Sequence, residues 1–204
     1  MNHKNHSSYD RAQNVLTTIF THWFSVVTFT YLGLYLIQVN FILPLEKTYF
    51  GNLTEYASLL FLPHAVRVIA AWLLGPKAIL ALFPASVISL HFYEPISAQG
   101  LGFYLYILFS SASAIIAFEF LKLMKIDIYP RGERMSSWRN VLFAGFLASF
   151  FNSLGGVYFI EAIPDTDALF ELIFRFIIGD VLGLLFSMFV LMILFRYYRY
   201  FENK

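Results

Sequence analysis

Long hydrophobic blocks, separated by short polar stretches, dominate the pattern of this chain. A helix that crosses a bilayer needs about 20 consecutive, mostly apolar residues. By that measure the pattern predicts about six membrane-spanning helices. Their expected bounds are 22–43, 56–74, 77–92, 102–121, 140–160 and 169–195. The third block is short, so we expect it to tilt, to re-enter the membrane or to cross only in part.

The distribution of positive charge tests this assignment, because loops rich in Lys and Arg stay on the cytoplasmic side of a membrane. With the N-terminus inside, the inner segments hold the cluster from Lys122 to Arg139 and the pair Arg196 and Arg199, whereas the outer side holds Lys47. The sequence therefore predicts an all-α integral membrane protein. It is expected to be a bundle of about six helices with short loops and both ends in the cytoplasm.

Composition supports a membrane domain. Of the 204 residues, 59% are hydrophobic and 13% are charged, whereas a soluble domain carries roughly 25% charged residues. We expect one transmembrane domain over 15–200, with cytoplasmic tails at 1–14 and 201–204. A net charge of +1 gives no case for nucleic-acid binding, and the lack of cysteine excludes disulfides. The lipid bilayer is the first expected partner, and the bacterial inner (plasma) membrane is the expected location.

Two opposite charges, Arg67 and Asp180, lie inside strongly hydrophobic segments. A charge at the centre of a bilayer costs about 3 kcal/mol or more, so such residues usually pair, face a protected cavity and mark a function. Counted from the expected outer ends of their helices, both lie about 16 Å deep at 1.5 Å per residue. We therefore expect Arg67 and Asp180 to face each other across the bundle.

His64 and Arg175 extend this polar centre. His64 shares a helix face with Arg67, and Arg175 is expected to reach Glu171 or to bend toward His64 and Asp180. Two cations and a histidine exceed what one helix lock requires, and the excess positive charge suits an anionic or carboxylate-bearing ligand. The plain alternative is a buried pair that only locks two helices together. No metal or cofactor is expected, because the histidines lack metal-ligand spacing.

Proline and glycine residues mark expected turns and close contacts. Pro63 removes a backbone donor beside the polar centre, and Gly75 with the following proline predicts a tight turn between the second and third helices. Other glycines are expected to allow helices to approach closely: Gly155, Gly156, Gly179 and Gly183. No catalytic motif is recognisable, so the sequence favours a protein that is not an enzyme.

Two short segments resemble MASE-type membrane-associated sensor domains of bacteria. The first, residues 60–77, carries an apolar-Pro start, small residues, then a glycine and a basic residue; the second, Arg175–Gly183, contains a Gly-Asp-x-x-Gly stretch. The resemblance implies an integral membrane sensor, of a kind usually attached to a histidine kinase or a diguanylate cyclase. It assigns family positions to Pro63, Gly75, Gly179, Asp180 and Gly183, whereas His64 and Arg67 depart from the small or neutral residues expected there.

Three functions fit these features. The first is a sensory or regulatory module that binds a small anionic ligand, or a partner's helices, at the polar centre. The second is a small transporter, or the substrate-binding component of a larger one. The third is a structural or assembly subunit in which the charges only lock helices together. The candidate partners are accordingly a signalling enzyme, a transporter subunit or a second copy of the chain.

Overall fold

The computed structural model describes residues 22–51, 58–91, 100–130, 137–159 and 166–202. Within these residues every regular element is a helix. Four helical stretches are long and apolar enough to cross a membrane: Trp23–Phe50, Pro63–His91, Leu101–Leu123 and Ile173–Glu202. The class predicted from the sequence, a helical membrane protein, agrees with this architecture. The predicted N-terminal tail lies outside the described residues.

The first helix is longer than predicted. It comprises α2 (Trp23–Ile37), the π-helical turn η1 (Gln38–Ile42) and α3 (Leu43–Phe50), which follow one another without a break. The end of this helix was predicted at residue 43, and Pro44 is the next residue. Proline lacks an N–H donor and crowds the carbonyl four residues earlier. The wider π turn lies just before this proline and accommodates it, so the helix continues to Phe50.

The second predicted helix begins later than expected. Helix α4 spans Pro63–Leu74, whereas the predicted start was residue 56. The start is later because the backbone amides before Pro63 donate to groups outside this helix. The amides of Leu59 and Leu60 donate to the Glu46 carboxylate, and the amide of Phe61 donates to the Gly179 carbonyl. These groups cannot also form helical hydrogen bonds. Residues 58–62 are therefore a non-helical segment, largely half-buried, that is held against the first helix and α8.

A turn connects α4 to the short helix α5 (Ile79–His91). Gly75 has a φ of 61°, a left-handed conformation that glycine adopts without strain, and opens the 3-10 turn η3 (Gly75–Ala78). The predicted turn is thus confirmed. At 1.5 Å per residue, α4 and α5 each rise about 20 Å, which is less than the roughly 30 Å thickness of the hydrocarbon core.

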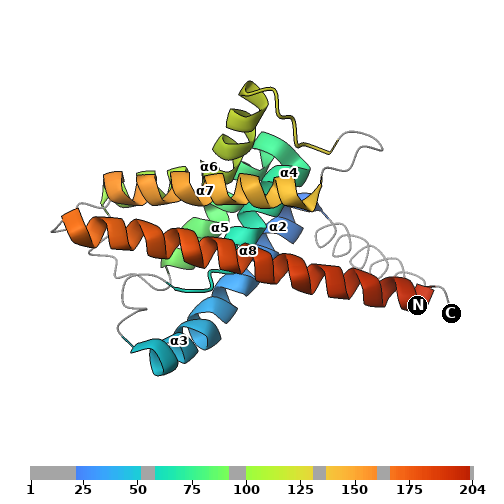
Figure 1. The fold of residues 1–204 in the computed structure, drawn as a ribbon, viewed down its shortest axis with the longest axis horizontal. Helices are drawn as coiled ribbons and strands as arrows, with labels where there is room; N and C mark the ends of the chain where they lie inside the picture. Colours follow the sequence, from blue (N-terminus) through green and yellow to red (C-terminus); the bar gives the residue numbers. More distant parts are fainter. Residues whose placement is uncertain (1–21, 52–57, 92–99, 131–136, 160–165, 203–204) are drawn as a thin grey trace, which may run out of the picture.

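The next two helices agree closely with their predicted bounds, whereas the last helix is longer than predicted. Helix α6 spans Leu101–Leu123, α7 spans Trp138–Phe159 and α8 spans Thr166–Glu202. Helix α7 packs against both α6 and α8, and it runs beside α8 in Figure 1. Helix α8, with 37 residues, continues beyond the predicted end at 195 and extends past the other helices.

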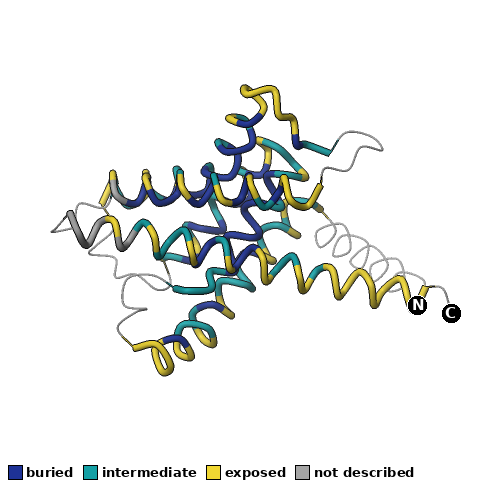
Figure 2. Tube along the Cα trace, in the orientation of Figure 1, coloured by how far each residue is buried: buried dark blue, intermediate teal, exposed yellow. Residues whose placement is uncertain are grey.

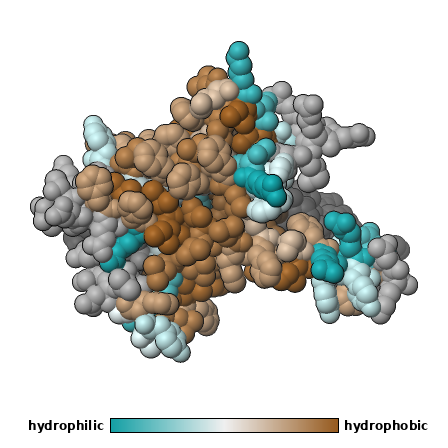
Figure 3. Space-filling view, in the orientation of Figure 1, coloured by the Kyte–Doolittle hydropathy of each residue, from teal (hydrophilic) through white to brown (hydrophobic). Residues whose placement is uncertain are grey.

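Helix α4 lies at the centre of the bundle, in contact with α2, α6, α7 and α8. Small side chains allow this packing, since Ala65, Ala71, Ala144 and Ala148 are fully buried in the core. Figure 2 shows the buried centre and the exposed outer half of α8. Figure 3 shows that hydrophobic side chains cover much of the outer face. An apolar exterior around a core that contains charged groups suits a lipid environment.

Candidate functional site

A cavity of about 380 Å³ lies where the helices converge. We call it the polar cavity. Its walls come from the first helix, from residues 58–62 and from α4, α5, α6, α7 and α8, and much of its lining is polar. The polar and charged side chains among its lining residues are Tyr31, Tyr35, Gln38, Lys47, Ser58, Arg67, Ser86, Tyr106, Ser110, Asn152 and Asp180.

Asp180 anchors one wall of the polar cavity and is almost fully buried, at 1% exposure. Its Oδ2 accepts hydrogen bonds from the Ser149 hydroxyl at 2.9 Å and from the Asn152 amide at 3.3 Å. Both donors come from α7, one helical turn apart. The same oxygen lies 3.3 Å from Nδ1 of His64. The carboxylate therefore joins α8 to α7 and α4 at the centre of the protein.

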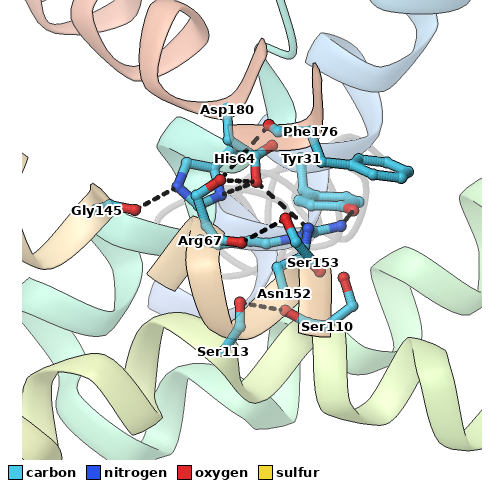
Figure 4. A network of polar contacts seen from close by, with 11 residues as sticks. Tyr31, His64, Arg67, Ser110, Ser113, Gly145, Asn152, Ser153, Phe176 and Asp180 are labelled. Atoms are coloured by element: carbon cyan, nitrogen blue, oxygen red, sulfur yellow. Dashed lines mark hydrogen bonds and ion pairs between the residues drawn. The ribbon is translucent and has the colours of Figure 1, made fainter. Parts of the chain in front are cut away.

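His64 is completely buried and contacts two groups (Figure 4). Its Nε2 lies 3.1 Å from the carbonyl oxygen of Gly145 on α7. Because a carbonyl oxygen only accepts, Nε2 must carry a proton in this contact. Nδ1 then faces Oδ2 of Asp180, and this contact is attractive only when Nδ1 carries a second proton. The predicted participation of His64 and Asp180 in one polar centre fits this geometry.

Arg67 departs from the predicted pairing. Its Nη2 donates to the Tyr31 hydroxyl at 2.9 Å, and its guanidinium lies 5.7 Å from the Tyr31 ring and 5.6 Å from the Phe61 ring. None of the ion pairs among the described residues joins Arg67 to Asp180, although both line the polar cavity. The helix starts at Pro63, so a rise of 1.5 Å per residue cannot be counted from residue 56. His64, on the same face and one turn earlier, takes the contact with Asp180.

Arg175 does not belong to the lining of the polar cavity. It is five residues before Asp180 on α8, which turns it about 140° away around the helix axis. Phe176, four residues before Asp180, lines the cavity instead. The predicted contact of Arg175 with Glu171 cannot be followed, because the Glu171 side chain lies outside the described residues.

Two side chains of the first helix hold the non-helical segment that forms part of the cavity wall. The Gln38 side chain donates to the Ser58 hydroxyl at 2.8 Å and accepts from the Leu62 amide at 3.1 Å. The Glu46 carboxylate accepts hydrogen bonds from the Ser58 hydroxyl at 3.0 Å and from the backbone amides of Leu59 and Leu60. Non-helical backbone at membrane depth is tolerated where protein encloses it or a cavity adjoins it, and Ser58 and Phe61 of this segment line the polar cavity.

The two glycines on α8 allow the non-helical segment 58–62, not another helix, to approach α8 closely. A Cβ on Gly179 would overlap the Ser58 carbonyl, and a Cβ on Gly183 would overlap the backbone of Phe61. The expectation of close helix approach is thus corrected at these positions, since the close neighbour is non-helical backbone. On α7, Gly155 accommodates the ring of Phe109 on α6, in agreement with the prediction. Gly156, on the same helix, lies near Tyr106.

Several buried polar atoms on the cavity walls lack a hydrogen-bond partner. They are Nε and Nη1 of Arg67, Oδ1 of Asn152 and Oδ1 of Asp180. Each buried donor or acceptor without a partner costs about 1–3 kcal/mol. The cavity is polar and far larger than the roughly 10–15 Å³ that a water molecule needs. It can therefore hold water or a small polar molecule that satisfies these atoms.

Sequence reasoning missed part of this site. Tyr31, Tyr35 and Gln38 follow one helix face at intervals of four and three residues, and this stripe could have been recognised. Ser149 and Asn152, three residues apart on α7, form a similar pair. The role of Glu46 depends on a contact with residues twelve to fourteen positions later, which no local pattern indicates.

Comparisons with protein-family models, with curated proteins and with solved structures find no match for this chain. In the described part of the chain, no group of three or more His, Cys, Asp or Glu side chains is arranged to hold a metal ion. Its function must therefore be inferred from the chemistry of the polar cavity.

Proposed function

We propose that the protein is an integral membrane module that binds a small anionic ligand in the polar cavity, with a sensory or regulatory role. Buried Arg67, which lines the cavity and has two nitrogens without partners, carries this proposal. A guanidinium stays charged in proteins, and burying a charge without a counter-ion is costly. A carboxylate or another small anion in the cavity would offset that cost and supply the missing acceptors.

We infer that the ligand enters from the outer side. The lining of the cavity extends along the first helix from Tyr31 to Lys47, a rise of about 24 Å. Lys47 belongs to the end of this helix that is expected outside. Its positive charge attracts anions toward the same cavity as Arg67. An internal Arg and a Lys near the opening would together favour a negatively charged ligand over a cation.

Six spans with both ends inside remain our proposal for the topology. The contacts of the turn after α4 support it. The indole nitrogen of Trp72 donates to the carbonyl of Ile128 at 3.0 Å, and Gly75 lies near the ring of Tyr129. The turn between α4 and α5 is thus at the same end of the bundle as the C-terminus of α6. With α4 and α5 as separate crossings, that end would be cytoplasmic.

The sensory role rests on the resemblance to MASE-type domains and on the lack of a catalytic motif. On this proposal the protein lies in a bacterial inner membrane and signals through a separate membrane partner. Asp180, through its contacts with α4 and α7, provides a physical link. A ligand on this carboxylate would shift the balance of the contacts that hold three helices together.

A purification experiment tests the proposal even while the identity of the ligand is open. The tagged protein would be extracted from its native membrane in mild detergent, and mass spectrometry would identify small molecules and proteins that remain bound. We expect a small acid from the wild type, a strong reduction from Arg67→Gln, and a signalling enzyme as co-purified partner. Arg175→Gln is the matched control, because it removes a charge from the bundle outside the cavity lining.

A purely structural role gives a different result. Arg67→Gln would then lower the abundance of the protein, but none of the preparations would contain a small acid. That outcome would make the charged centre a helix lock. A co-purified transport ATPase in place of a signalling enzyme would retain ligand binding but make the protein a transporter component.

A further inference from the structure

The unsatisfied atoms of the polar cavity are of two opposite kinds. On α4, Nε and Nη1 of Arg67 are donors, whereas on α7 and α8, Oδ1 of Asn152 and Oδ1 of Asp180 are acceptors. A simple anion would satisfy only the donors. A ligand that completes the cavity must also present a hydrogen-bond donor to the amide and carboxylate oxygens. The inventory of free atoms thus restricts the ligand more than the charge of Arg67 does.

The charges on the walls indicate what kind of donor this is. Oδ2 of Asp180 already accepts two hydrogen bonds and lies near His64, so Oδ1 is the carboxylate oxygen that still lacks a partner. Hydrogen bonds between charged partners are roughly twice as strong as neutral ones. A positively charged ammonium group therefore complements Asp180 better than a hydroxyl group. The neighbouring amide oxygen of Asn152 can accept a second ammonium hydrogen.

The arrangement of Arg67 and Asp180 fits a ligand that carries both charges. The two side chains line one cavity without forming an ion pair with each other. A zwitterion placed between them would bring a carboxylate to the guanidinium and an ammonium group to the carboxylate. Each buried charge would then gain an opposite charge, which compensates the cost of desolvating all four groups better than either half of the ligand alone.

The remaining walls describe the third part of the ligand. Apolar and aromatic residues also line the cavity, from α2, α3, α5, α6 and α8: Tyr35, Leu43, Leu90, Ile107 and Phe176. Such surfaces favour an aliphatic or aromatic substituent over a charged one. The volume of about 380 Å³ lies within the range of small-molecule sites, about 300–1,000 Å³.

We propose that the ligand is an amino acid or a close analogue with an apolar side chain, whose carboxylate binds Arg67 and whose ammonium group binds Asp180 and Asn152. This inference rests on the proposed function, because it assumes that the polar cavity binds an anionic group. It adds the second, cationic group and the apolar substituent. It also assigns Asp180 a role in specificity, distinct from its role in joining helices.

Matched compounds test the inference on the full-length protein in mild detergent. Thermal unfolding and calorimetry would compare L-leucine with 4-methylpentanoate, L-phenylalanine with 3-phenylpropanoate, and each with the corresponding amine that lacks the carboxylate. We expect the amino acids to raise the melting temperature and to bind at least about tenfold more tightly than the deaminated acids. A site with buried polar groups rejects an analogue that leaves those groups unpaired.

Three other outcomes would contradict this inference, and the first of them leaves the proposed function standing. If the deaminated acids bind as tightly as the amino acids, the zwitterion is wrong and anion binding stands. If the amino acids, the deaminated acids and the amines all fail to bind, both proposals are overturned. Binding of the amines alone would likewise contradict both, because it would assign the cavity to cations.

Variants locate the discriminating group. Asp180→Asn should weaken the amino acids and leave the acids nearly unchanged, so that the preference falls at least severalfold. Asn152→Ala should lower the same preference, and it serves if Asp180→Asn fails to fold. Ser153→Ala is the matched control, because this buried neighbour on α7 bonds only to backbone and does not line the cavity. An unchanged preference in Asp180→Asn and Asn152→Ala would overturn the assignment.

Discussion

At the residue scale, the central feature is a set of buried ionisable side chains in which Arg67 and Asp180 do not form an ion pair with each other. His64 contacts Asp180, whereas Arg67 turns toward Tyr31 and the rings around it. Breaking a buried pair by removing one partner is strongly destabilising, because it leaves an uncompensated charge. The contacts in this protein therefore predict which pairs of substitutions are coupled.

A double-mutant cycle tests the partner of Asp180. We expect His64→Gln and Asp180→Asn to be coupled by about 0.5–3 kcal/mol, the range for residues in contact. The cycle of Arg67→Gln with Asp180→Asn should show a smaller coupling, because those side chains do not form an ion pair. Unfolding in mixed detergent micelles would give the free energies. A larger coupling for Arg67 would restore the pairing expected from the sequence.

Gly183 provides a second residue-scale prediction. A methyl group there would overlap the Phe61 backbone, and inserting a methylene-sized group into a packed core costs about 1–3 kcal/mol. Gly183→Ala should therefore lower the unfolding free energy by at least that amount. Gly33→Ala is the control, since no atom of another part of the protein lies within 4 Å of a Cβ at this position on α2. If both substitutions have the same effect, the close approach is not important for stability.

The residues of the polar centre were partly predictable from the sequence. Which of them could be predicted depends on how far each differs from the apolar residues around it. Charged residues stand out against an apolar background, so Arg67 and Asp180 were recognised without any structure. Ser149 and Tyr31 are ordinary residues in membrane helices, and their roles depend on which helices are neighbours. Sequence periodicity describes the face of one helix, but it does not identify the helix opposite.

At the scale of elements, the main difference between the predicted and the observed architecture is the segment 58–62, which is not helical. Its apolar composition reads as the start of a helix, and the signal for a later start is Pro63, which follows the segment and occupies the first helical position. The competing partners are distant in sequence: Gln38 and Glu46 on the first helix and Gly179 on α8. By contrast, α6 and α7 form local hydrogen bonds over their whole lengths, so their bounds were predictable within about two to four residues.

The carboxylate of Glu46 should control the order of this segment. Glu46→Gln removes a charged acceptor from the amides of Leu59 and Leu60 and places an amide donor near them. Hydrogen bonds to charged groups contribute about 1.5–3 kcal/mol, so we expect these amides to exchange roughly tenfold faster or more. Hydrogen exchange followed by mass spectrometry on peptides covering 58–62 would measure this. Glu202→Gln, at the exposed end of α8, is the control and should leave the segment unchanged.

At the scale of the whole molecule, the path of α4 and α5 decides the topology. Each helix is shorter than the bilayer core, so the pair could form two crossings, one continuous crossing or a re-entrant loop. One crossing would put the C-termini of the first helix and of α6 on the same side. Two crossings, or a re-entrant loop, would put them on opposite sides. The turn around Lys77 distinguishes these last two cases, because only two crossings bring it to the cytoplasmic surface.

Cysteine labelling measures all of these positions, and the chain has no cysteine of its own. Tyr49, Lys77, Leu123 and Glu202 are exposed in the structure, so each can be replaced singly by cysteine. With six spans and the N-terminus inside, a membrane-impermeant maleimide should label Tyr49→Cys in intact cells. The other three should react only after the membrane is opened. Labelling of Tyr49→Cys and Leu123→Cys from one side would exclude six spans. If Leu123→Cys is protected but Lys77→Cys reacts from outside, α4 and α5 re-enter the membrane. In that case the polar cavity would lie beside a re-entrant pair of helices. The non-helical wall at 58–62, which leads into α4, is compatible with that arrangement.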